Sequence, residues 1–158
     1  MQALDLTGLK VLIAKALNVD ESLVRDSYSK TLNDKTAFLT VHLLTSTQKG
    51  HEYKFFKGET EVITSTREAV VSVNAYGKNA NFITEKLNSC FYTSEFLKGL
   101  KNLGLGLVTV SPIRNLSLTV GGGVEERASI DLTLSYITRI EASQNEIKTA
   151  NFGIKVNR

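Results

Sequence analysis

Residues 124–136 read VEERASIDLTLSY and, from Arg127 onward, alternate between polar and apolar side chains. The apolar members are Ala128, Ile130, Leu132, Leu134 and Tyr136. The polar members are Arg127, Ser129, Asp131, Thr133 and Ser135. A period of two predicts a strand with one face in a core and the other available for contacts. Gly121, Gly122 and Gly123 precede this strand and permit a bend that other residues resist.

The rest of the chain divides into helical and strand patterns. Apolar residues at three-and-four spacing predict three helices, over 6–19, from Ala80 to about Phe91, and over 93–103. In the third helix, Leu97, Leu100 and Leu103 form the expected apolar stripe. Strand patterns cover 37–45, 51–57, 61–76, 107–110 and 150–156, and the TQKG stretch at 47–50 predicts a turn. On the 61–76 strand, we expect Ala69, Val71, Val73 and Ala75 to share one face.

This order of elements favours one α+β domain over residues 1–158. Neighbouring strand patterns are joined by short turns, and the helical patterns stand between two groups of strands. Such an arrangement is typical of a mostly antiparallel β-sheet with helices packed on one face. No fixed-period repeat or Pro/Ser-rich linker divides the chain.

Composition excludes several classes of protein. The chain has 158 residues, of which 42% are hydrophobic and 22% charged, as in an ordinary globular domain. Its net charge of +3 comes from 19 basic and 16 acidic residues spread along the sequence, without the clustered basic stripe of a general nucleic-acid binder. A single cysteine permits no internal disulfide. Without a signal-like N-terminus or a membrane-length apolar run, we expect synthesis and retention in a cytoplasm, with no membrane partner.

No metal or nucleophile constellation is evident, so we expect no catalytic residue, metal or cofactor. His42 and His51 are the only histidines, and zinc sites require several converging ligands. A pair of Cys90 with a distant histidine is conceivable, but Cys90 falls on an apolar helical stripe, which favours an inert buried thiol.

The glycine and carboxylate patterns also favour structure over chemistry. Gly99 and Gly104 have the spacing of a phosphate-binding loop, but Leu105 stands where its lysine is required. Glu125 and Glu126 lie beside Arg127, which disfavours a carboxylate poised near neutral pH. A solvated or inter-subunit charge cluster is the better interpretation.

Several short motifs resemble those of one viral protein family. They are VNAYG at 73–77, Ala80 and Leu87 on a helix, LG at 103–104, RNLS at 114–117, EERA at 125–128, DL at 131–132, and Tyr136. Over about 70 residues, this set resembles the tail terminator, or neck, proteins of long-tailed bacteriophages.

The resemblance implies a structural virion protein of the tail and neck, assembled in the host cytoplasm. Copies would form a ring, expected to be a hexamer, that caps the tail tube protein, stops its polymerisation and joins the head-completion or stopper protein. Genomic DNA would pass through the bore without sequence-specific binding. Ring contacts join two different patches of neighbouring subunits. We expect one patch to contain the charged residues Arg114, Glu125, Glu126 and Arg127, with Arg114 facing a neighbour or the bore. The same charges could simply be solvated.

Two other functions remain open from the sequence. A head–tail stopper or tail-completion protein would act on the other side of the same joint. A small nucleic-acid-binding module is suggested by Tyr53, Phe55 and Phe56 interleaved with Lys54 and Lys57. Acidic residues at Glu52, Glu59 and Glu61 crowd that segment and disfavour it.

Overall fold

The structure is a computed structural model that describes residues 4–27 and 36–144. In chain order its elements are α1 (Leu6–Leu17), the 3-10 turn η1 (Glu21–Leu23), β1 (Val24–Asp26), β2 (Phe38–Lys57), β3 (Thr60–Tyr76), α2 (Ala80–Cys90), α3 (Ser94–Asn102), β4 (Gly106–Val110), β5 (Arg114–Asn115), β6 (Leu118–Val120), β7 (Gly123–Glu125) and β8 (Arg127–Ser143). The strand predicted at 150–156 lies outside the described residues.

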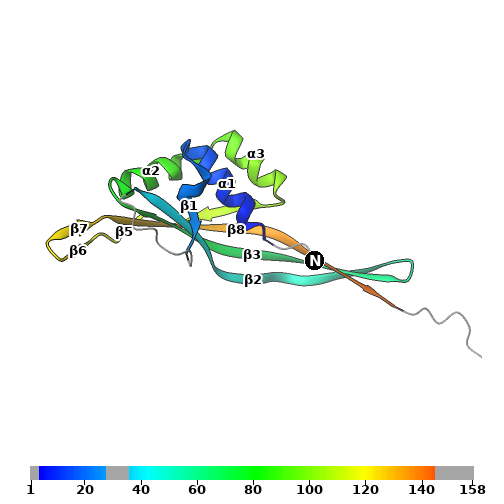
Figure 1. Cartoon of the computed structure of the whole chain (residues 1–158). Helices are drawn as coiled ribbons and strands as arrows, with labels where there is room; N and C mark the ends of the chain where they lie inside the picture. The colour runs from blue at the N-terminus through cyan, green and yellow to red at the C-terminus, as the bar shows by residue number, and fades with distance from the viewer. Residues whose placement is uncertain (1–3, 28–35, 145–158) are drawn as a thin grey trace, which may run out of the picture.

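One mostly antiparallel sheet carries the helices on a single face. Its strand order is β1-β2-β3-β8-β4, and β5 also pairs with β8. Only the short β1–β2 pairing is parallel among the described strands. The helices α1, α2 and α3 lie on the same side of this sheet (Figure 1). The α+β class, the antiparallel sheet and the one-sided helical layer are therefore confirmed.

The core forms where the alternating strands meet the helices. Ala69, Val71, Val73 and Ala75 of β3, and Ala128, Ile130, Leu132 and Leu134 of β8, are all at most 1% exposed. Leu9 and Ile13 of α1, Leu87 of α2, and Phe96 and Leu100 of α3 cover them from the helical side. Burying a large aliphatic side chain of this kind contributes roughly 1.5–3 kcal/mol, so the predicted apolar faces of β3 and β8 hold the layers together.

Side chains cap two of the three helices that the structure describes, and the face that α3 buries differs from the prediction. Asp5 caps α1, since its Oδ1 accepts a hydrogen bond of 2.8 Å from the Gly8 N–H. Thr93 caps α3 in the same way, with its Oγ1 accepting a hydrogen bond of 3.3 Å from the Phe96 N–H. Phe96 is buried and Leu97 is 41% exposed, so the predicted placement of Leu97 on the buried stripe is wrong.

The predicted turn at 47–50 is also wrong, because β2 continues through it. Lys49 pairs with Thr66, and Tyr53 pairs with Thr64, so β2 holds two extra residues between these positions. The backbone absorbs them as an irregularity at Gly50, whose φ is 72°. Turn-forming residues here produce a bulge within a long strand, and the chain reverses later, at Gly58.

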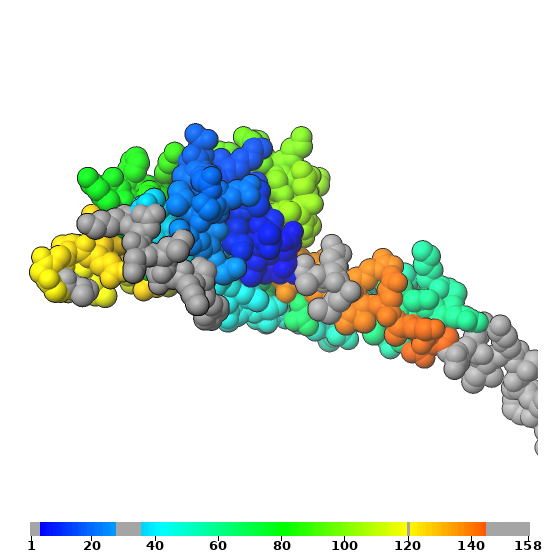
Figure 2. Space-filling view, viewed as in Figure 1, coloured from blue at the N-terminus to red at the C-terminus, as the bar shows by residue number. Residues whose placement is uncertain are grey.

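Two β-ribbons project beyond the helical layer at opposite ends of the molecule (Figures 1 and 2), one continuing the main sheet and the other forming a small sheet of its own. At one end, residues 46–57 of β2, 60–68 of β3 and 136–143 of β8 form a three-stranded ribbon, here called the arm. At the opposite end, β6 and β7 form a two-stranded ribbon around a turn at Gly121 and Gly122 (residues 118–125), here called the finger. The predicted bend at the triple glycine is thus confirmed.

Gly77 and Gly121 provide a test of how tightly the end of β3 is packed. Both have positive φ, +97° and +55°, but a Cβ on Gly77 would lie 2.9 Å from the Ala37 Cα, whereas one on Gly121 meets nothing within 4 Å. We expect Gly121→Ala to lower the free energy of unfolding by about 1–2 kcal/mol through backbone strain. Gly77→Ala should lower it by a further ~1–3 kcal/mol because of the clash. Urea denaturation measures both losses, and equal losses would contradict this packing.

Candidate functional site

The sheet face away from the helices carries a row of polar and aromatic side chains, here called the polar face. It comprises Phe38, Thr40 and His42 of β2, Ser72, Asn74 and Tyr76 of β3, Arg114 of β5, and Arg127, Ser129 and Asp131 of β8. Strand alternation produces this face, because its members alternate with residues that point into the core. Its central residues are nevertheless buried, with Ser72, Asn74 and Ser129 exposed by 4%, 3% and 1%.

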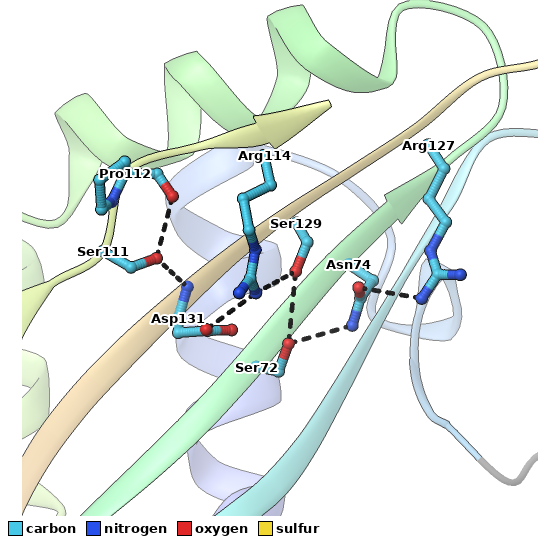
Figure 3. A network of polar contacts seen from close by, with 8 residues as sticks. All are labelled: Ser72, Asn74, Ser111, Pro112, Arg114, Arg127, Ser129 and Asp131. Atoms are coloured by element: carbon cyan, nitrogen blue, oxygen red, sulfur yellow. Dashed lines mark hydrogen bonds and ion pairs between the residues drawn. The ribbon is translucent and has the colours of Figure 1, made fainter. Parts of the chain in front are cut away.

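Arg114 covers one side of the polar face. The pairing of β5 with β8 places Arg114 opposite Ser129. Its Nη2 donates hydrogen bonds of 3.1 Å to Ser129 Oγ and 2.8 Å to Asp131 Oδ2. The Asp131 side chain is 15% exposed, and that of Arg114 is 51% exposed. Arg114 therefore neutralises a largely buried carboxylate (Figure 3). About half of the Arg114 side chain remains exposed.

A chain of hydrogen bonds continues from this ion pair to Arg127. Ser129 Oγ lies 3.5 Å from Ser72 Oγ, which accepts a bond of 3.3 Å from Asn74 Nδ2. Asn74 Oδ1 in turn accepts a bond of 3.3 Å from Arg127 Nη2 (Figure 3). Such a network fixes β3 and β8 relative to each other on the face that the described helices leave uncovered.

Two cations and two rings close the end of the polar face next to the finger. Arg25 lies 5.1 Å from the centre of the Phe38 ring. Phe38 stacks on Tyr76 at 4.9 Å, and Arg127 lies 5.0 Å from the centre of the Tyr76 ring. Each cation–π contact contributes about 0.5–1 kcal/mol at exposed sites. Arg127 thus stabilises the fold of its own subunit.

The structure separates the four predicted interface residues. Arg114 and Arg127 belong to the same network, whereas the Glu126 carboxylate accepts a hydrogen bond of 2.5 Å from the Asn79 N–H at the start of α2. An anion at this end of a helix is favoured by the helix dipole. Glu125 is exposed at the base of the finger and borders a cavity of about 200 Å³ next to Arg25. A role of these residues in subunit contacts stays a prediction.

Sequence reasoning missed the inner members of the network, Ser72 and Asn74. Their alternation with Val71 and Val73 is visible in the sequence and could have placed them on the polar face. Their contact with Ser129 and Arg127 depends on the register between β3 and β8, which strand patterns alone do not give.

Possible catalytic groups are dispersed. Cys90 is half-buried on α2, where its Sγ donates to the Ala16 carbonyl oxygen at 3.5 Å. His42 lies on the opposite face of the sheet, with Nδ1 2.7 Å from Ser27 Oγ, and His51 is exposed on the arm. Within residues 4–27 and 36–144, no group of three or more His, Cys, Asp or Glu side chains could hold a metal ion. Over the same ranges, no helix is long and apolar enough to cross a membrane.

The arm aromatics do not form a single stacking surface. Tyr53 and Phe55 lie on one face of β2 with their ring centres 5.7 Å apart, while Lys54 and Phe56 point to the other face. Lys54 Nζ is 2.7 Å from Glu61 Oε1, so its charge is matched within the arm. The rings and the cations are therefore divided between two faces, unlike a single platform of stacked rings between cations.

Removal of the Arg127 cation should destabilise the isolated subunit. Arg127→Met keeps an aliphatic chain but removes the cation over Tyr76 and the bond to Asn74. We expect a loss of about 1–3 kcal/mol in the free energy of unfolding, measured by urea denaturation. Lys78→Met changes an exposed cation and serves as the control. Equal stability of the two variants would show that the Arg127 contacts contribute nothing.

The ion pair in the arm should be visible in a pH titration. The hydrogen bond from Lys54 lowers the pKa of Glu61, and the same bond raises the pKa of Lys54. The contribution of the Glu61 carboxylate to folding stability is therefore complete above the ordinary glutamate pKa. It is lost as the pH falls through the lowered pKa of Glu61. The stabilisation by Lys54 is complete below the ordinary lysine pKa and is lost as the pH rises through its raised value.

We expect Lys54→Met to raise the pH midpoint at which the Glu61 carboxyl titrates. Carbon NMR of the Glu61 carboxyl measures this midpoint. Lys57→Met, an exposed lysine on the same strand, should leave that midpoint in place. An unchanged Glu61 midpoint in Lys54→Met would mean that the ion pair is absent in solution.

The amino-acid sequence of this chain matches one known protein family. The sequence model of the family described as Phage neck terminator protein matches residues 7–158, and thus includes the helical layer, the sheet, the finger and the arm. A search of curated proteins finds no match. The chain therefore belongs to the phage neck terminator protein family and is a structural protein of the phage tail and neck.

Proposed function

We propose that copies of this protein assemble into a hexameric ring that caps the finished phage tail tube and stops its polymerisation. The opposite side of the ring joins the head-completion or stopper protein, and genomic DNA passes through the bore without sequence-specific recognition. The observation that carries this proposal is the family match over residues 7–158. It also favours a terminator over a stopper on the other side of the joint.

The shape of the subunit supports a role in assembly. The arm, which continues the main sheet, and the finger, which is a two-stranded sheet of its own, project past the helices at opposite ends (Figure 1). Each leaves surface that the chain's own core does not use. Exposed apolar side chains lie at both ends: Tyr53, Phe56, Ile137 and Ile140 on the arm, and Leu118 and Val124 on the finger. These side chains give both ribbons apolar surface that a protein partner could cover.

The predicted interface residues fit this proposal in two different ways. Arg114 and Glu125 retain exposed side chains that a neighbouring subunit or the bore could contact. Arg127 and Glu126 act mainly inside the subunit, where they hold β8 to β3 and to α2. Their contribution to the ring is therefore to keep the base of the finger in place.

Native mass spectrometry and a tube-length assay test the proposed function. We expect a mass of six subunits, either for the protein alone or after its addition to tail tubes, and a six-fold ring in negative stain. Purified tube protein should stop elongating once the terminator is present, whereas tube protein alone should continue. A chain that stays monomeric on tubes and leaves their elongation unchanged would contradict the proposal.

A further inference from the structure

We propose that the finger of one subunit docks into a groove on the arm of the next subunit. This inference rests on the proposed ring and names the two surfaces that join its subunits. Its partner is a second copy of this chain.

The groove lies on the arm, on the same side of the sheet as the helices but beyond them. It has a volume of about 330 Å³, and its lining includes Ile63, Arg67, Tyr136 and Ile140. Ile63 and Arg67 share a face of β3 with the core residue Ala69, so strand alternation directs them to the helical side. The groove is bordered on the helical side by Leu4, just before α1, and its lining residue Ile140 is 50% exposed.

Arg67 gives the groove an unmatched positive charge. Three other cations of the arm have partners in ion pairs, Lys49 with Glu68, Lys54 with Glu61, and Arg139 with Glu141. The fourth, Lys57, is exposed and lies on the opposite face of β2 from Lys54. Within the part of the chain that the structure describes, Arg67 has no such partner, although Glu52 also borders the groove. An arginine beside apolar side chains suits a partner that brings both a carboxylate and an aliphatic group.

The finger presents that combination on one face. Leu118 and Glu125 are directly opposite each other in the β6–β7 pairing, so their Cβ atoms lie roughly 4.5–5.5 Å apart on the same side. Leu118 is 63% exposed, and Glu125 forms no ion pair among the described residues. The finger therefore offers an apolar group and an anion to a groove that offers apolar groups and a cation.

The two surfaces can meet only between copies. Finger and arm lie at opposite ends of the sheet (Figures 1 and 2), so a finger cannot reach its own groove. A contact between two different patches is heterologous, and its repetition around a closed rotation generates a ring. Each subunit then contributes one finger and one groove.

Cysteine crosslinking tests the contact directly. In a Cys90→Ser background, Leu118→Cys combined with Ile140→Cys should give a ladder of covalent oligomers on mild oxidation of assembled protein. A mixture of the two single-cysteine proteins should give covalent dimers and no ladder, because each subunit then carries only one half of the crosslink. Leu118→Cys combined with Phe82→Cys, a site on α2 that is 67% exposed against 50% for Ile140, is the control and should give no ladder.

Charge reversal tests the Arg67–Glu125 pairing independently. Arg67→Glu and Glu125→Arg should each reduce the ring fraction in native mass spectrometry by about tenfold or more, because each places like charges in one joint. The double variant should recover rings, because every joint can again pair opposite charges. Arg139→Glu, on the other face of the arm, should leave ring formation unchanged. Thermal melts establish that each variant is folded.

The outcomes separate this inference from the proposed function. If the unmodified protein forms rings but the Leu118→Cys, Ile140→Cys variant gives no ladder and the charge reversals have no effect, the finger–groove contact is wrong and the ring stands. If the unmodified protein forms no ring on tail tubes, both proposals fail.

Discussion

The pairing of β3 with β8 is the constraint on which the rest of this structure depends. The two strands stay in register from Thr60 opposite Ser143 to Tyr76 opposite Arg127 without a bulge. Seventeen paired residues span roughly 55 Å, which is longer than the helical layer can cover. The same ladder therefore supplies the core in its middle, the arm at one end, and the attachment of the finger at the other.

Strand alternation then divides this ladder into two chemically different faces. The helical side is apolar over the core and changes to the groove residues Ile63 and Arg67 beyond it. The other side holds the network from Arg114 to Arg127, which connects β5, β8 and β3 away from the helical layer. Burial of Asp131 and Asn74 in that network requires their partners to be in place, so the polar face favours one register of the sheet.

Much of the fold could be predicted because local patterns report local structure. The alternation from Ala128 to Leu134 identified the buried face of β8, and the spacing of apolar residues located the three helices. The errors arose where tertiary packing overrides composition. A turn-like stretch at Gly50 is held as a bulge because β3 continues beside it, and the rotation of α3 buries Phe96 in place of Leu97.

The candidate site was less accessible from the sequence. Arg114, Glu126 and Arg127 were recognised as functional candidates, but their partners Asp131, Asn79 and Asn74 are set by strand register and by the approach of α2 to β8. The groove combines side chains from β3 and β8, which are far apart in the chain, and so has no local signature.

We propose that this chain acts through surfaces that join it to copies of itself at the end of a tail tube. A cryo-EM reconstruction of the protein assembled on tail tubes would show these surfaces in contact. We expect a single ring at the tube end in which the finger of each subunit occupies the arm groove of its neighbour. Subunits dispersed along the tube, or joined only through their helical layers, would contradict it.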